Sequence, residues 1–173
     1  MRAPPIAGPG RFARARRGAA ALEFALVLPT LLIMLLGSVE VERLVRLRMA
    51  LASAAQTMAA LAAMQTGTPP ATLADDCTGA QLLLAPFGST NVAIAVADVA
   101  RDSSAGAPTL AWQDNGCGQA RAIAAPTSLA APLVPGVGDQ AIVAVATYTY
   151  TDPLPFLLPT MISLSATGYA RPR

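Results

Sequence analysis

Histidine and lysine are both absent from the 173 residues, and all twelve basic residues are arginines. Histidine is the commonest general base and metal ligand in proteins, and lysine is the usual amine nucleophile. The side chains that most often serve as general base, metal ligand and amine nucleophile are therefore missing. We expect no catalytic site, no metal and no cofactor. Aromatic residues are also scarce, at 5% of the sequence, so the core is expected to contain few large side chains.

Acidic residues are missing from the N-terminal segment, which holds five of the twelve arginines. Beyond residue 18 the chain has seven arginines and ten acidic residues, a formal charge of −3. Binding to nucleic acid normally requires a basic patch. We therefore expect no nucleic-acid partner, and no polar pocket for a small-molecule substrate is evident in the sequence.

A long apolar run occupies residues 18–39, and its 22 residues include one charge, Glu23. At 1.5 Å per residue, a helix of this length crosses the roughly 30 Å hydrocarbon core of a bilayer. The run is longer than the apolar region of a cleavable signal, and helical sequence continues to about Gln65, so a retained anchor is expected. The alternative is signal-peptidase cleavage near residues 50–54. The excess of arginine before the run predicts a cytoplasmic N-terminus.

The remaining sequence predicts an α+β fold, in which a long helix packs on an antiparallel sheet of about four strands. We expect residues 1–17 to be disordered, a helix over 19–65, a short helix near 78–85 and a loop over 120–139. Alternating patterns predict strands at 91–99, 109–113, 141–151 and 161–170. Tyr148 and Tyr150 share a strand face, either in the core or as a contact patch. Spacings of three and four predict an apolar helical stripe of Leu44, Leu47, Leu51, Ala54, Met58, Leu61 and Gln65.

The two cysteines, Cys77 and Cys117, both follow the apolar run. Exported domains usually fold in an oxidising compartment, so a single disulfide is expected, with two buried free thiols as the alternative. A closed loop of about 41 residues would contribute roughly 4 kcal/mol to stability by the chain-entropy estimate.

The most informative motif is RRGAAALEFALVLP at residues 16–29. A glycine that follows arginines and precedes a lone glutamate by five residues, at the start of an apolar helix, has the pattern of a prepilin-peptidase site. Over about 45 residues the chain resembles the TadE-like family of tight-adherence pseudopilins. The resemblance implies cleavage between Gly18 and Ala19, and an assembly role for Glu23 and Phe24.

That resemblance also implies the organisation of the chain. A leader would occupy residues 1–18, a transmembrane segment 19–40, the exported continuation of the helix 41–66, and an exported α+β domain 67–173. The implied location is the bacterial inner membrane, with the C-terminal domain periplasmic. The implied partners are prepilin peptidase and other pilin and pseudopilin subunits. The alternatives are a pseudopilin of a type II secretion or competence system, and a signal-anchored periplasmic ligand-binding domain.

Glu23 has a physical interpretation of its own. An ionised, unpaired carboxylate inside a membrane helix is unfavourable, so the group is expected to be protonated or to meet a cation. Cleavage after Gly18 would create such a cation, the α-amino group of Ala19, and a neighbouring subunit displaced along the helix axis would bring its own amine beside Glu23. Alternatively, Glu23 simply lies at the level of the cytoplasmic lipid headgroups.

Overall fold

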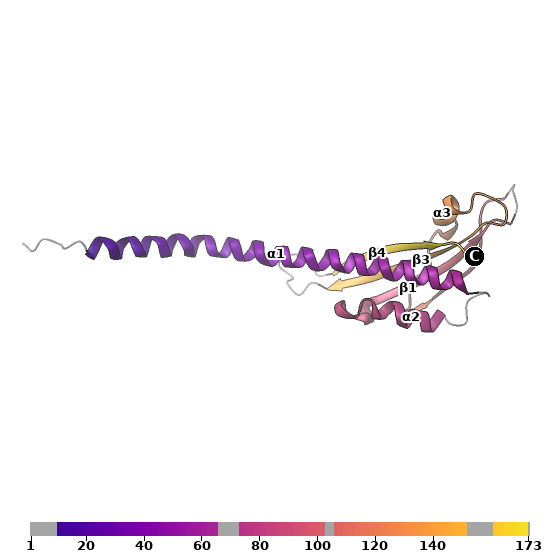
Figure 1. Cartoon of the computed structure of the whole chain (residues 1–173), viewed down its shortest axis with the longest axis horizontal. Helices are drawn as coiled ribbons and strands as arrows, with labels where there is room; N and C mark the ends of the chain where they lie inside the picture. Colours follow the sequence, from indigo (N-terminus) through magenta and orange to yellow (C-terminus); the bar gives the residue numbers. More distant parts are fainter. Residues whose placement is uncertain (1–9, 66–72, 103–105, 152–160, 173) are drawn as a thin grey trace, which may run out of the picture. The chain divides into compact units, whose positions relative to one another are not determined.

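The structure is a computed structural model that describes residues 10–65, 73–102, 106–151 and 161–172. It consists of a long helix, several short helices and an antiparallel sheet (Figure 1). The chain divides into two compact units, Met1–Arg43 and Leu44–Arg173. The long helix α1 (Gly10–Met64) contributes residues to both units.

The helix α1 begins earlier than the sequence suggested. Residues 10–17 were expected to be disordered, and this expectation is wrong because α1 starts at Gly10. Alanine and arginine both have high helix propensity, so a helix that forms in the apolar run extends readily into the preceding segment. Residues 1–9 lie outside the described part of the chain.

The expected apolar stripe is present in the outer half of α1. Leu47, Leu51, Ala54 and Met58 are all 0% exposed. The buried surface is wider than predicted because several alanines next to the stripe are also buried. These are Ala55, Ala59 and Ala62. Their small side chains allow the helix backbone to lie close to the sheet.

The sheet has four strands, and all of its neighbouring strands are antiparallel. In chain order they are β1 (Val92–Ala100), β2 (Thr109–Cys117), β3 (Gln140–Thr151) and β4 (Met161–Ala170). Their spatial order is β2-β1-β3-β4, so β1 and β3 are central while β2 and β4 are edges. The predicted α+β class and the four-stranded antiparallel sheet are confirmed.

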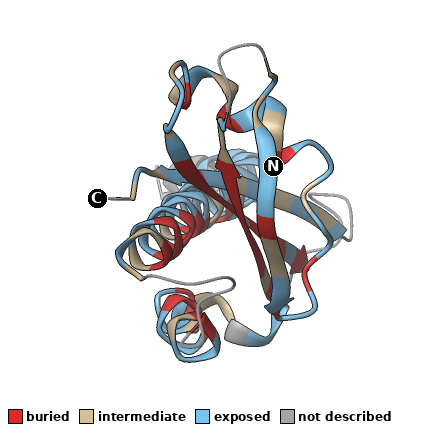
Figure 2. Cartoon of the chain, turned by 90° about the vertical axis from the view of Figure 1, so that its right-hand side faces the viewer, coloured by how far each residue is buried: buried red, intermediate tan, exposed pale blue. Residues whose placement is uncertain are grey.

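One face of the sheet carries the main core. Even-numbered residues of β1 and β3, including Ile94, Ile142 and Tyr148, pack with buried residues of α1 and of α2 (Leu73–Leu82). Figure 2 shows that the buried residues concentrate on the strands and on the helix surfaces turned toward them. The tyrosine pair belongs to this core rather than to a contact patch. The Tyr148 hydroxyl donates a hydrogen bond to the carbonyl oxygen of Phe87, in the 3₁₀ helix η1 (Ala85–Phe87).

The opposite face is only partly covered. A smaller core forms where Val99, Ala141 and Val143 pack against Ala130 and Val134. Ala130 ends α3 (Pro126–Ala130), which leads into η3 (Ala131–Leu133), so residues 120–139 are not the uninterrupted loop that we expected. Pro126 is the first residue of α3 and Pro132 is the second residue of η3, and a proline near the start of a helix favours its initiation. In Figure 1, α2 and α3 lie on opposite sides of the sheet.

Candidate assembly site on the N-terminal helix

The N-terminal half of α1 exposes its apolar side chains instead of burying them. Leu22, Phe24 and Leu26 are 73%, 62% and 78% exposed. Within the described residues, one helix is long and apolar enough to cross a membrane, and its apolar window is 0% buried in the chain. The core helix of a soluble protein would be mostly buried, so this segment of α1 is a candidate membrane anchor.

Each residue of the proposed processing and assembly motif lies in this exposed segment. Gly18, Ala19, Glu23 and Phe24 are all exposed on α1. Ala19 and Glu23 are four residues apart, so they lie on the same face of the helix. A Cβ atom added to Gly18 would meet nothing within 4 Å. Packing within this chain therefore does not explain a glycine at this position.

The apolar segment contains a proline and a serine, and membrane-spanning helices tolerate both. α1 continues through Pro29, which lacks a backbone N–H. The Ser38 hydroxyl donates to the Leu35 carbonyl oxygen at 2.7 Å, so this group finds its partner inside the helix. In hydrocarbon, polar groups must be satisfied internally, and serine achieves this by such local bonds.

Cys77 and Cys117 form a disulfide in the structure, with Cα atoms 5.6 Å apart. The bond joins α2 to the end of β2, and both cysteines are buried. Directly after Cys117 the chain turns tightly through Gly118 at φ 66°. A Cβ on Gly118 would lie 2.1 Å from the carbonyl oxygen of Val92, so only glycine fits this turn.

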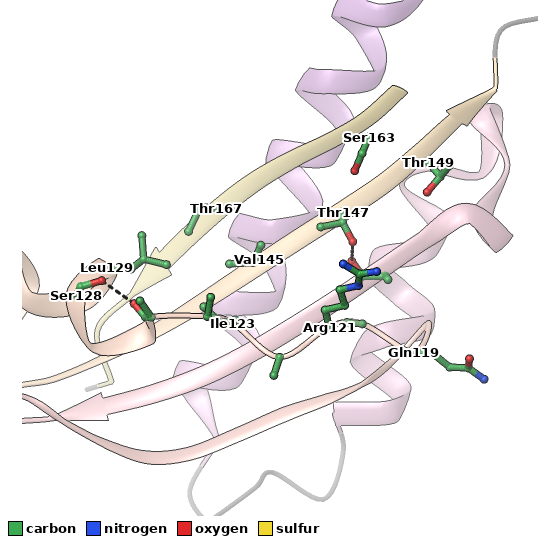
Figure 3. A pocket seen from close by; sticks show the side chains of 15 residues that line it. Gln119, Arg121, Ile123, Ser128, Leu129, Val145, Thr147, Thr149, Ser163 and Thr167 are labelled. Carbon is green, nitrogen blue, oxygen red and sulfur yellow. Dashed lines mark hydrogen bonds between the residues drawn. The ribbon is translucent and has the colours of Figure 1, made fainter. Parts of the chain in front are cut away.

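A groove of about 790 Å³ lies on the partly covered face of the sheet (Figure 3). Its lining combines small apolar residues with the hydroxyls of Thr147, Thr149, Ser163 and Thr167 and with the guanidinium of Arg121. The lining contains no carboxylate, imidazole or thiol. The groove therefore offers no pair of groups for general acid and base chemistry.

Asp98 is the buried carboxylate of the sheet, at 2% exposure. Burial raises its pKa above the ordinary value, while hydrogen bonds from the Gln140 and Trp112 side chains and from the Val99 backbone oppose the rise. Its Oδ1 atom has no hydrogen-bond partner among the described residues. No group of three histidine, cysteine or acidic residues suited to a metal ion occurs in the described ranges. Asp98 is thus a buried, hydrogen-bonded acid that belongs to no candidate metal site within the described residues.

Sequence reasoning missed a contact between α1 and β4. The side-chain amide of Gln56 donates to the Tyr169 carbonyl oxygen at 2.8 Å and accepts from the Tyr169 N–H at 3.3 Å. The preceding residue, Gly168, is buried against the Ala55 backbone. A glycine within a strand often marks a close backbone approach, and this signal was present in the sequence.

The exposed apolar helix and the α+β unit together define a class of protein: an α+β protein with a candidate membrane anchor near its N-terminus. Comparison with protein families is more specific, because residues 18–60 match the model of the family described as TadE-like protein. The resemblance seen in the sequence is confirmed over that segment, and it indicates a component associated with a tight-adherence pilus system. The comparison with curated proteins and the comparison with solved structures each found no match.

Proposed function

We propose that this chain is a minor pseudopilin-like structural component of a tight-adherence pilus system, acting in pilus assembly and adhesion without catalysis of its own. The observation that carries the proposal is the coincidence of the family match with the exposed apolar helix. The match begins at Gly18 and continues along α1 to residue 60. In this interpretation, residues 19–40 anchor the protein in the bacterial inner membrane, and residues 67–173 lie in the periplasm.

Processing would occur between Gly18 and Ala19. Prepilin peptidase would remove residues 1–18 on the cytoplasmic side, where the arginines hold the N-terminus. Two observations support this site: Gly18 is exposed, and no neighbour in the chain restricts the side chain at its position. The function of Gly18 would therefore be recognition by the peptidase, since helix packing does not require it.

Assembly would use Glu23 and Phe24. Both side chains are exposed, which leaves them available to neighbouring subunits. A carboxylate at this depth gains most by pairing with a cation, and processing would place a new α-amino group on the same helix face of each subunit. Pairing between the Glu23 of one subunit and the Ala19 amine of the next would hold the helices in register. Phe24 would add apolar contact beside this pair.

The test is the mass of the mature protein isolated from cells with and without the cognate prepilin peptidase. We expect the peptidase to shorten the wild-type chain by residues 1–18, and Gly18→Trp to prevent this processing. Gly37→Trp is the matched control, because it introduces the same side chain into the same helix at another open glycine. It should leave processing unchanged. An identical N-terminus in both strains would contradict the proposed processing.

A further inference from the structure

β4 is an edge strand without the usual protection. Among the residues that the structure describes, β3 is the one strand that pairs with β4. The sequence MISLSATGYA contains neither a charge nor a proline. Soluble proteins commonly protect exposed edges with such residues, because the unpaired backbone groups otherwise form a template for another strand.

The contact with Gln56 identifies which backbone groups of β4 face outward. The N–H and carbonyl of Tyr169 bind the Gln56 amide, so Tyr169 occupies a position where the backbone turns away from β3. These positions alternate along an antiparallel strand. The register of β3 and β4 is continuous from Ile142↔Ala170 to Thr151↔Met161. Ser163, Ser165 and Thr167 therefore also direct their backbone groups outward.

The outward backbone groups belong to exposed residues and have no partner within the described part of the chain. Ser163, Ser165 and Thr167 are exposed, and their backbone groups bind no partner among the residues that the structure describes. Beside Thr167 lies an open hollow of about 510 Å³. Its other lining residues are Ala52, Ser53, Gln56 and Thr57 of α1. The hollow and the strand edge together carry no charge.

The other edge of the sheet differs. The register between β1 and β2 is irregular at two places, between Ile94 and Val96 and between Asp98 and Val99. On β2 itself, the Asp114 carboxylate accepts a hydrogen bond from the Gly116 N–H. Irregularities and charges of this kind discourage strand addition. The contrast singles out β4 as the edge that can accept another strand.

We propose that β4 binds an uncharged, extended segment of a different protein, which adds to the sheet as a fifth strand. The backbone N–H and carbonyl groups of Ser163, Ser165 and Thr167 would form hydrogen bonds with the backbone of the added strand. The Gln56 amide already makes such bonds with the backbone of Tyr169 on the same edge. The neutral hollow beside Thr167 would receive a small or hydroxyl-bearing side chain. This surface lies in the unit Leu44–Arg173, so the proposal does not depend on leader processing.

A second copy of this chain fits the β4 edge less well than a segment of a different protein does. Figure 1 shows that β4 and the part of α1 beside it run in the same direction, and the two elements touch where Ala55 meets Gly168. Two β4 strands related by a two-fold axis would pair antiparallel, which would give α1 opposite directions in the two copies. That arrangement conflicts with two chains anchored in one membrane, an argument that rests on the proposed function.

The first test uses proline to locate the outward N–H groups in the full chain in detergent micelles. Ser165→Pro removes an outward N–H, so its melting temperature should stay close to that of Ser165→Ala. Ala166→Pro removes an N–H that faces β3, so it should lower the melting temperature substantially. Equal destabilisation by Ser165→Pro and Ala166→Pro would overturn the assignment of the edge.

The second test measures strand addition by amide hydrogen exchange. The probe is a capped, uncharged peptide of alternating threonine and valine, and the control is the same peptide with alternate amides N-methylated. The unmodified probe should slow exchange at Ser163, Ser165 and Thr167 at least tenfold in the wild type and in Ser165→Ala. It should have no such effect at Ser163 and Thr167 in Ser165→Pro. Absence of protection, equal protection by the methylated peptide, or wild-type self-association that Ser165→Pro abolishes would overturn the proposal.

Discussion

Gly168 of β4 lies directly against the backbone of Ala55 in α1. A Cβ atom placed on Gly168 would be 2.4 Å from both the carbonyl carbon and the carbonyl oxygen of Ala55. Real side chains essentially never approach a backbone this closely, so either the strand or the helix would have to move. The missing side chain at Gly168 therefore sets the distance at which α1 packs on the sheet.

The first prediction concerns this contact. Gly168→Ala should destabilise the protein by about 1–3 kcal/mol, because the added methyl group overpacks a backbone contact that cannot yield locally. The measurement is urea unfolding followed by circular dichroism. Gly79→Ala in α2 is the matched control, since its Cβ meets nothing within 4 Å. Removing a helical glycine there should stabilise by about 0.5–1 kcal/mol. Equal stability of Gly168→Ala and wild type would show that the close approach is absent.

The second prediction concerns Cys77 and Cys117. Peptide mapping of protein from its native compartment, without reduction, should recover the two cysteine-containing peptides linked. The double variant Cys77→Ala/Cys117→Ala should lose about 4 kcal/mol of stability, because its unfolded chain is no longer closed into a loop. Two free thiols in the mapped protein would contradict the bond.

The third prediction follows from the buried Asp98. Burial raises its pKa in the folded protein, so the folded state holds this proton more tightly than the unfolded state does. The contribution of Asp98 to stability is then most favourable below its ordinary pKa and declines as the pH rises through the raised folded-state pKa. Asp98→Asn should remove this decline and make the protein more stable than wild type at neutral pH.

The measurement for Asp98 is the free energy of unfolding at about pH 3, below the ordinary pKa of aspartate, and at about pH 7. Asp102→Asn makes the same chemical change on an exposed side chain and serves as the control. It should leave the difference between the two pH values close to that of wild type. A variant Asp98→Asn that is less stable than wild type at neutral pH would show that the hydrogen bonds to the carboxylate outweigh its desolvation.

The fourth prediction tests the assembly role of Glu23. Glu23→Gln should leave membrane insertion and leader cleavage intact but weaken association with other pilin subunits. Loss of about 1.4 kcal/mol of pairing energy corresponds to a tenfold weaker association. Glu23→Leu should have the same effect while making the helix more apolar, which separates lost pairing from lost insertion. The measurement is crosslinking of the processed protein to its pilus partners, together with a surface-adhesion assay.

Glu42→Gln is the control for Glu23, because it removes a carboxylate from the same helix outside the apolar run. It should crosslink as the wild type does. Normal association of both Glu23 variants would mean that the carboxylate only marks the headgroup level, and the pairing mechanism would be wrong even though the family match remains.

Local patterns predicted much of the fold and of the candidate site. The strand at 141–151 was placed within one residue of β3 because its alternation is long and uninterrupted. The start of α1 was missed because propensity extends a helix beyond the apolar run that predicted it. The short helices α3 and η3 were missed because five and three residues are too few to show a period. The roles of Gly18 and Glu23 stay predictions, and their signal is a spacing along the chain, which requires no tertiary information.

The sequence by itself determined the features that depend on neighbouring residues: the apolar segment, the helical stripe around Leu51, the alternating strands and the segment that matches the TadE-like family. Only the tertiary structure decided the strand order β2-β1-β3-β4, the burial of Asp98 and the contact of Gln56 with Tyr169. These features join residues far apart in the chain, and Gln56 and Tyr169 are separated by 113 positions. Such pairings depend on how helix and sheet faces pack, because each face can satisfy its hydrophobic pattern against more than one partner.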